Sequence, residues 1–273
     1  MPVLLDLKVE KNDPKPGEER SYEIADGVKM VFCWIPAGEA QLGSPKEEKV
    51  RSTDEDEAVR GKYQTKGFWL AKYPVTQQEY EAVIGKNPSY FIPSQEQVKK
   101  DGITDAKRFP VENVSWDDTQ EYLKKLNGRG GVVKVFGTAG TFVLPHEDAW
   151  EYAYRGGKGN KQAFYWGDTL NGDKANCNGN YPYGTATTGA YLQRTTIVGS
   201  YETKAPHPWK LCDMSGNVYQ WCDNLYSSEH NFRIVRGGAW FDISRNCRGA
   251  NRVRHVPGNR NDYSGFRVCL RLD

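Results

Sequence analysis

Residues 236–270 read "RGGAWFDISRNCRGANRVRHVPGNRNDYSGFRVCL", and the ends of this stretch differ in character from its middle. The start combines small glycines with an indole, and "GFRVCL" (265–270) has the apolar composition of a buried final strand. The middle, residues 241–264, shows no period of 2 or 3.6 and contains five arginines but no lysine. We therefore predict an irregular segment placed between two pieces of scaffold.

The whole chain has the size and composition of one globular domain. Its 273 residues are 38% hydrophobic and include 28 glycines and 14 prolines, so we expect a single loop-rich domain over residues 1–273. A net charge of +2 gives no reason to expect nucleic acid as a partner. The apolar runs are too short for a transmembrane segment. Residues 1–20 lack the basic and apolar regions of a signal peptide as they stand.

Cysteine and histidine spacing argues against a metal or cofactor site. No two of the six cysteines have CxxC spacing, and the four histidines show no metal-ligand spacing, so we predict no metal and no cofactor. The chain also lacks a nucleophile elbow and a phosphate-binding glycine loop. Cys33 and Cys269 lie in apolar runs and are predicted to be buried small hydrophobes.

Few stretches have helical periodicity. Residues 76–88 begin at a threonine cap, residues 115–131 begin at Ser115 and end in glycines, and a short helix is expected at 150–155. Short strands are expected at 30–38, 68–75, 141–144 and 266–270. Eight tryptophans and sixteen tyrosines can hold long polar loops such as 171–191 in place. The predicted class is α+β with an unusual share of irregular chain.

Seven segments together resemble the sulfatase-modifying-factor family, that is, the formylglycine-generating-enzyme-like domain. They occur in the family's order, and the resemblance implies a C-type-lectin-like fold with little regular structure. The segments are "MVFCWIPAGEAQLGS" (30–44), "FWLAKYPVTQQEY" (68–80), "FPVENVSWDDTQEY" (109–122), "VLPHEDAWEYAYRGG" (143–157), "LCDMSGNVYQWCDN" (211–224), "VRGGAW" (235–240) and "SGFRVCL" (264–270).

The residues that carry the family's oxidase chemistry are missing. Resemblance places the paired copper-binding thiols at Ser244 and Gly249, and neither is a cysteine. A calcium-binding loop of the family usually has Glu where this chain has Gln220, a weaker ligand for a hard cation. We expect Asn217 to organise a turn there. The resemblance thus implies the scaffold without the enzyme; the alternative is an altered oxidase that uses Cys247.

The composition of residues 241–264 suggests a different role. These 24 positions contain no Lys, Glu, Gln, Met or Trp, although the five types supply 60 of residues 1–240. They are also the types that an Asn codon ending in a pyrimidine cannot reach when only its adenines change. The segment resembles the variable region of proteins that a retroelement diversifies by adenine-directed mutagenesis. The pattern is especially similar to the Treponema variable protein.

This resemblance divides the segment into constant and changing positions. The predicted constant residues are Trp240, Cys247, Arg248, Ala250, Asn251, Arg252, Pro257, Arg260, Gly265, Phe266 and Arg267. The changing positions should face solvent, because they cannot also supply core packing. The predicted ligand contacts are Phe241, Asp242, Ile243, Arg245, Asn246, Val253, Arg254, His255, Val256, Gly258, Asn259, Asn261, Asp262, Tyr263 and Ser264.

Three functions remain open at this point: a receptor with a variable site at residues 240–264, an altered oxidase, and a partner-binding module whose polar tail is an ordinary loop. For the receptor we expect an unknown protein or surface ligand as partner. Five arginines in one exposed segment favour acidic or aromatic epitopes. The resemblance implies a cell-surface or exported protein, lipid-anchored in its full-length form.

Overall fold

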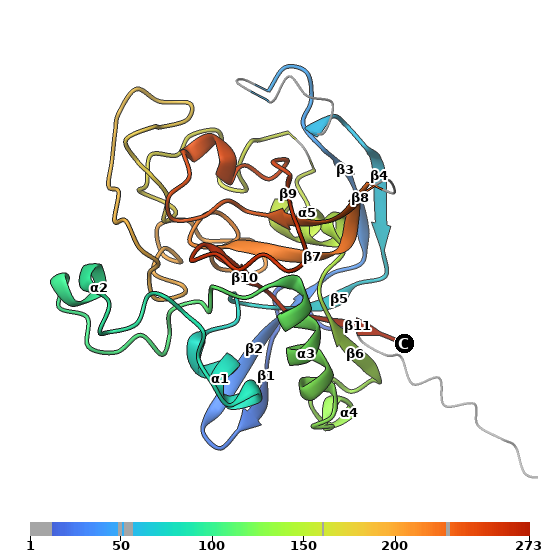
Figure 1. Cartoon of the computed structure of the whole chain (residues 1–273). Helices are drawn as coiled ribbons and strands as arrows, with labels where there is room; N and C mark the ends of the chain where they lie inside the picture. Colours follow the sequence, from blue (N-terminus) through green and yellow to red (C-terminus); the bar gives the residue numbers. More distant parts are fainter. Residues whose placement is uncertain (1–12, 49–50, 52–56, 160, 228–229) are drawn as a thin grey trace, which may run out of the picture.

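The computed structural model describes residues 13–48, 51, 57–159, 161–227 and 230–273. Two main sheets and a small two-stranded sheet form its framework, with α1, α3 and α4 beside the strands β1 and β2 (Figure 1). Among the described residues no helix is long and apolar enough to cross a bilayer. The elements are β1 (Glu19–Ala25), β2 (Val28–Ile35), β3 (Gly38–Leu42), β4 (Gly61–Thr65), β5 (Phe68–Ala71), α1 (Gln77–Ile84), α2 (Glu96–Lys100), α3 (Trp116–Asn127), α4 (Val132–Phe136), β6 (Gly140–Val143), α5 (Glu147–Arg155), β7 (Tyr219–Ser227), β8 (His230–Arg236), β9 (Val253–His255), β10 (Ser264–Phe266) and β11 (Cys269–Leu272).

The five-stranded sheet has the order β1-β2-β5-β11-β6, and β5 and the second half of β2 are buried on both faces. Because side chains alternate along a strand, Phe32 and Trp34 of β2 enter the core beneath α1, α3 and α4. Cys33 and Ile35 of the same strand enter the second core, which contains α5. Continuous apolar runs such as "VFCWI" (31–35) are therefore strands with two buried faces.

Two predicted helices begin at their predicted caps. The Thr76 hydroxyl accepts the Glu79 amide, and the Glu79 carboxylate accepts the Thr76 amide, which forms a capping box at the start of α1. Ser115 and Asp118 make the same reciprocal pair at the start of α3. The third predicted helix, at 150–155, is confirmed as α5 and starts three residues earlier.

The predicted final strand is wrong in detail, because residues 264–272 belong to two sheets. β10 runs parallel to β7 in the sheet β10-β7-β8-β9, whereas β11 lies between β5 and β6. Arg267 lies between the two strands, and its buried guanidinium donates to the carbonyls of Ala71, Lys72 and Cys212. The chain therefore changes sheets at a buried arginine whose donors bind carbonyls of two other segments.

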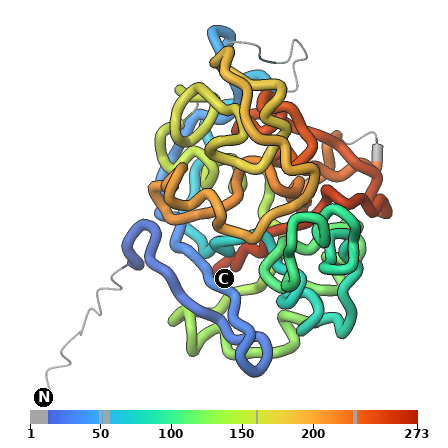
Figure 2. The backbone as a smooth tube through the Cα atoms, turned by 90° about the vertical axis from the view of Figure 1, so that its left-hand side faces the viewer, coloured from blue at the N-terminus to red at the C-terminus, as the bar shows by residue number. Residues whose placement is uncertain are grey.

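Long loops between α5 and β7 carry few regular elements, as the sequence predicted. They form the yellow-to-orange part of the chain in Figure 2. Buried aromatic side chains hold them: Phe164 stacks on Trp166 with 5.0 Å between ring centroids, and the Tyr165 hydroxyl donates to the Ala205 carbonyl. Such contacts replace the ladder hydrogen bonds that a sheet would supply.

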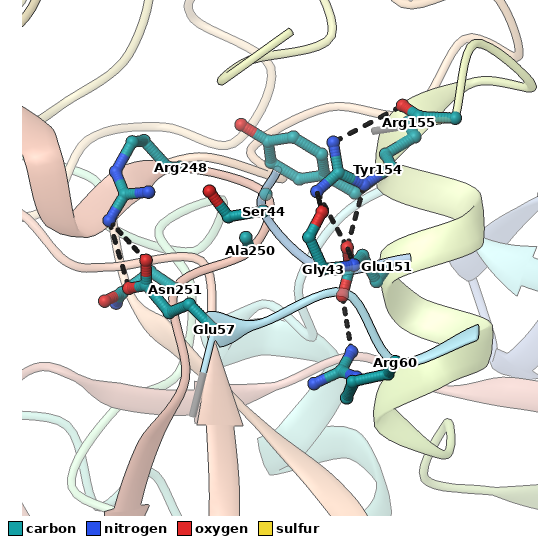
Figure 3. Close-up of polar contacts among 12 residues, drawn as sticks. Gly43, Ser44, Glu57, Arg60, Glu151, Tyr154, Arg155, Arg248, Ala250 and Asn251 are labelled. Carbon is teal, nitrogen blue, oxygen red and sulfur yellow. Dashed lines mark hydrogen bonds and ion pairs between the residues drawn. The ribbon is translucent and has the colours of Figure 1, made fainter. Parts of the chain in front are cut away.

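A buried ion network joins α5 to two other parts of the chain. Glu151 on α5 accepts hydrogen bonds from Arg155, from Arg60 and from Arg236 on β8, the last at 2.6 Å (Figure 3 shows the first two). Burial by itself would raise the pKa of Glu151, but the three guanidinium groups outweigh it and lower that pKa to about 2. The Glu151 carboxylate is therefore charged and fully paired.

Substituting Glu151→Gln is expected to lower the free energy of unfolding by about 3 kcal/mol near neutral pH, because buried guanidinium groups lose their counter-charge. The depressed pKa makes the wild-type advantage fully present above about pH 4.5, and it is lost as the pH falls towards 2. Chemical denaturation of both proteins across this range measures the difference.

Glu121→Gln is the matched control, since Glu121 makes an exposed pair with Lys125 at 3.0 Å on α3. It should change the free energy of unfolding by less than about 0.5 kcal/mol. Equal effects of the two substitutions, or a Glu151 effect that does not shrink in acid, would contradict the central role of the network.

Candidate binding surface at residues 240–264

The irregular segment is held mainly through its own backbone. Arg236 at the end of β8 donates to three consecutive carbonyls, those of Gly249, Ala250 and Asn251, at 2.8–3.1 Å. Backbone bonds join other parts of the segment to the framework, and these bonds do not depend on side-chain identity. The pairs are Asn178 N–Asp242 O (2.8 Å), Ser244 N–Tyr181 O (3.2 Å), Gly249 N–Ala163 O (2.9 Å), Trp116 N–Pro257 O (2.8 Å) and Asn113 N–Asn261 O (2.8 Å).

Three arginines that were predicted to be constant form ion pairs with the framework. Arg248 is fully buried and contacts both carboxylate oxygens of Glu57 at 2.8 and 3.0 Å (Figure 3). Arg252 makes a two-point contact with Glu147 of α5 at 2.6 and 2.7 Å. Arg260 makes the same kind of contact with Asp118 of α3. Each arginine anchors a different part of the segment.

Trp240 links the start of the segment to its end and to two neighbouring loops. Its amide donates to Asn217, and its indole nitrogen donates to the Asp262 carbonyl at 3.1 Å. Its ring packs edge-on against Phe91 and stacks on Tyr191. An indole supplies both the apolar face and the donor that this junction uses.

The fifteen predicted contact residues differ in exposure. Most of them reach the surface. Exposed are Ile243, Arg254, Val256, Gly258 and Asn259; half-buried are Phe241, Arg245, Asn246, Val253, His255, Asn261, Asp262 and Tyr263; buried are Asp242 and Ser264.

The two buried residues correct the expectation that every changing position faces solvent. The Asp242 carboxylate accepts the Ala239 amide and the Asn246 side-chain amide, both at 2.9 Å, and its exposed fraction is 6%. Burial raises the pKa of Asp242. Ser264 is fully buried because it begins β10. Positions that were predicted to change can thus be buried and help to hold the segment in place.

Several half-buried members form an aromatic group on the surface. The Phe241 and Tyr263 rings lie 4.7 Å apart, and His255 lies 6.0 Å from Tyr263. Phe241, Tyr263 and Val253 also pack against the first core, so one side of each supports the fold. Arg254 extends over Tyr226, with 5.0 Å from the guanidinium carbon to the ring centroid.

Sequence reasoning missed aromatic residues of adjacent loops that border this surface. Tyr181 is 61% exposed and its carbonyl accepts the Ser244 amide; Tyr90 is 50% exposed beside Phe91. Tyr191 stacks on Trp240. The sequence indicated that residues 171–191 form a long polar loop that contains tyrosines, but no local signal indicates which distant segment such a loop contacts.

The surroundings of the two positions expected for the oxidase thiols do not suit a pair of cysteines. A Cβ added at Gly249 would lie 2.6 Å from the Tyr154 ring, so a cysteine does not fit without movement. Ser244 is fully buried. Among the described residues, no group of three or more His, Cys, Asp or Glu side chains could hold a metal ion.

The expected turn at Asn217 is confirmed. Its backbone has φ of 67°, and its side-chain oxygen accepts the Thr196 amide at 2.9 Å. Nearby, the Gln220 oxygen accepts hydrogen bonds from the Trp150 indole and from Arg267, which gives this neutral side chain a structural role.

The known proteins that the chain resembles include both an enzyme and a relative that is named as inactive. The bovine (Bos taurus) inactive C-alpha-formylglycine-generating enzyme 2 is 28% identical over 176 residues, which are 62% of this chain and 52% of the relative. The formylglycine-generating enzyme of Streptomyces coelicolor is 28% identical over 193 residues, 63% of this chain and 55% of the enzyme. The chain spans about half the length of these curated relatives.

A solved structure and a family model complete the comparison. Treponema denticola variable protein 1 superposes with a TM-score of 0.68 at 21% identity, covering 93% of this chain and 99% of that chain. This likeness confirms the predicted fold class, a loop-rich mixed fold of the C-type-lectin-like, formylglycine-generating-enzyme type. Residues 23–272 match the model of the sulfatase-modifying factor enzyme 1-like domain. The chain therefore belongs to the sulfatase-modifying factor enzyme 1-like domain family.

Proposed function

We propose that this protein is a non-enzymatic receptor that displays a variable ligand-binding site on residues 240–264, diversified by a retroelement. One observation carries the proposal: the two classes of residue differ in their contacts with the framework, which hold even the exposed Arg260 through its pair with Asp118. The arginines that were predicted to be constant contact framework carboxylates or backbone carbonyls, whereas thirteen of the fifteen positions predicted to change are exposed or half-buried.

The way in which the segment is held supports the same function. A site whose side chains change must keep its path without them, and here Arg236 and the neighbouring loops hold backbone atoms. Backbone carbonyls and amides stay the same when a side chain changes. The exposed positions can therefore vary at small cost in stability.

The oxidase alternative is disfavoured by the environment of Cys247. This thiol is fully buried, and the Cys177 thiol together with burial raises its pKa well above the usual value. A buried, protonated thiol is a poor nucleophile and a poor metal ligand. Within the described part of the chain, the Cys247 side chain does not reach the surface.

The exposed chemistry of the segment suits a protein or surface ligand. Arg254 and the half-buried Arg245 offer cations, and Phe241 and Tyr263 offer aromatic faces, a combination that favours acidic or aromatic epitopes. We propose no nucleic-acid partner. The receptor would act at the cell surface or after export, lipid-anchored in its full-length form.

Five simultaneous substitutions at exposed or half-buried positions of the segment are expected to leave the fold intact. Changing Ile243, Arg245, Arg254, Val256 and Asn259 to serine together should shift Tm by no more than about 5 °C, since surface changes cost little. Thermal melting followed by circular dichroism measures this.

Arg248→Ser, a single change three residues from Arg245, is the matched comparison. It removes the buried guanidinium that pairs with the Glu57 carboxylate and should lower Tm by roughly 10 °C. If the five changes unfold the protein, or Arg248→Ser is the milder variant, the receptor proposal fails.

The gene offers a direct test of diversification. If adenine-directed mutagenesis of Asn codons produced the segment, all fifteen proposed contact residues must have codons that end in C or T. Seven positions are informative, because their amino acids also have codons that end in A or G: Ile243, Arg245, Val253, Arg254, Val256, Gly258 and Ser264. Arg248, Arg252 and Arg260 are the control and are free to use any arginine codon. Sequencing that finds an AGA or AGG codon at Arg245 or Arg254 would refute this origin.

Binding capacity is tested with a display library. The thirteen exposed or half-buried positions are randomised with NNY codons while Asp242 and Ser264 are kept, and the library is selected against lysozyme and serum albumin. A control library randomises exposed residues of α2 and α3, at 96, 99, 100, 121, 124 and 125. We expect at least tenfold more specific binders from the first library. Equal yields, or predominantly unfolded members of the first library, would oppose the proposal.

A further inference from the structure

Cys177 and Cys247 come from distant parts of the chain and meet beneath the proposed binding surface. Cys247 ends the 3₁₀ turn Ser244–Cys247, and Cys177 lies in the long loop of residues 171–191. The Asn178 amide donates to the Asp242 carbonyl at 2.8 Å, which brings the two backbones alongside each other. Both thiols are buried in one small apolar cluster with Ala163, Phe164, Leu170, Ala175 and Tyr183.

The two thiols are neighbours within this cluster. Their interaction lowers the pKa of Cys177 and raises that of Cys247. The Cys177 sulfur also lies 3.5 Å from the Ser244 hydroxyl. A neighbouring thiol that is readily deprotonated is what thiol–disulfide exchange requires of its attacking partner.

We propose that Cys177 and Cys247 form a disulfide when the chain folds in an oxidising compartment. With oxidised glutathione as the oxidant, both thiols lose a proton and an electron each, one S–S bond forms between them, and the glutathione disulfide is reduced to two glutathione thiols. The bond is a covalent modification site outside the proposed ligand contacts, and it does not depend on what the receptor binds.

The other described cysteines lack such a partner. Cys33 and Cys269 both lie opposite Leu70, on strands to either side of β5, so two strand spacings of about 4.8 Å separate them. This exceeds the Cα separation of about 4.4–6.8 Å that a disulfide spans. The Cys212 and Cys222 thiols instead face backbone carbonyls, those of Lys210 and Gln220.

The disulfide would stabilise the fold around the variable segment without using any position that changes. It would close a loop of about 70 residues and tie the first turn of the segment to the loop of residues 171–191. This stabilisation would not depend on the side chains that change. Because both thiols are buried, an oxidant reaches them during folding far more readily than in the native protein.

The test refolds the full chain from denaturant under two conditions, with a glutathione redox buffer and with dithiothreitol. Remaining thiols are alkylated under denaturing conditions, and intact mass and peptide maps are recorded. We expect four alkylated cysteines instead of six after oxidative refolding, one cross-linked peptide pair joining Cys177 to Cys247, and a Tm higher by roughly 5–10 °C.

Two variants serve as controls. The double variant Cys33→Ala/Cys269→Ala should keep the cross-link and the Tm increase, whereas Cys177→Ala should lose both. Folded, oxidised wild type with six alkylated cysteines, or a cross-link between other cysteines, would overturn the proposal. If Cys177→Ala does not fold, the wild-type peptide map decides; if refolding fails, protein exported to a bacterial periplasm is mapped in the same way.

Discussion

The buried guanidinium of Arg236 is the constraint on which the arrangement depends. Its donors hold three consecutive carbonyls of the irregular segment, and its charge is neutralised by Glu151, which also binds Arg60 and Arg155. This one cluster joins β8, α5 and the strand region near β4 to the segment. A planar side chain with five donors can make such contacts at once, which lysine cannot.

The network gives the segment a path that its own outward-facing side chains do not determine. Arg248, Arg252 and Arg260 add three further anchors along it, each on a carboxylate of a different framework region. Different residues therefore stabilise the segment and face outward on its surface. The separation is incomplete at Asp242 and Ser264, where residues of the variable type support a turn and begin a strand.

Local signals predicted the elements whose causes are local. The caps Thr76 and Ser115 specify helix starts through side-chain bonds to residues three positions away, and α1 and α3 begin there. Apolar runs predicted the central strands β2 and β5. The edge strands β1, β3 and β4 were missed, because half-exposed polar strands carry weak patterns and are determined by their partners. The strands β7, β8 and β9 of the second sheet were not predicted either.

The sequence alone determined the family, the loop-rich fold class, the loss of the paired oxidase thiols and the unusual composition of residues 241–264, because these are properties of residue type and order. Only the tertiary structure decided which members of that segment are buried, that Cys247 has Cys177 beside it, and that Tyr181 and Tyr191 contact the segment. These facts depend on contacts between segments far apart in the chain, and residue type or local periodicity does not encode which distant segment a side chain meets.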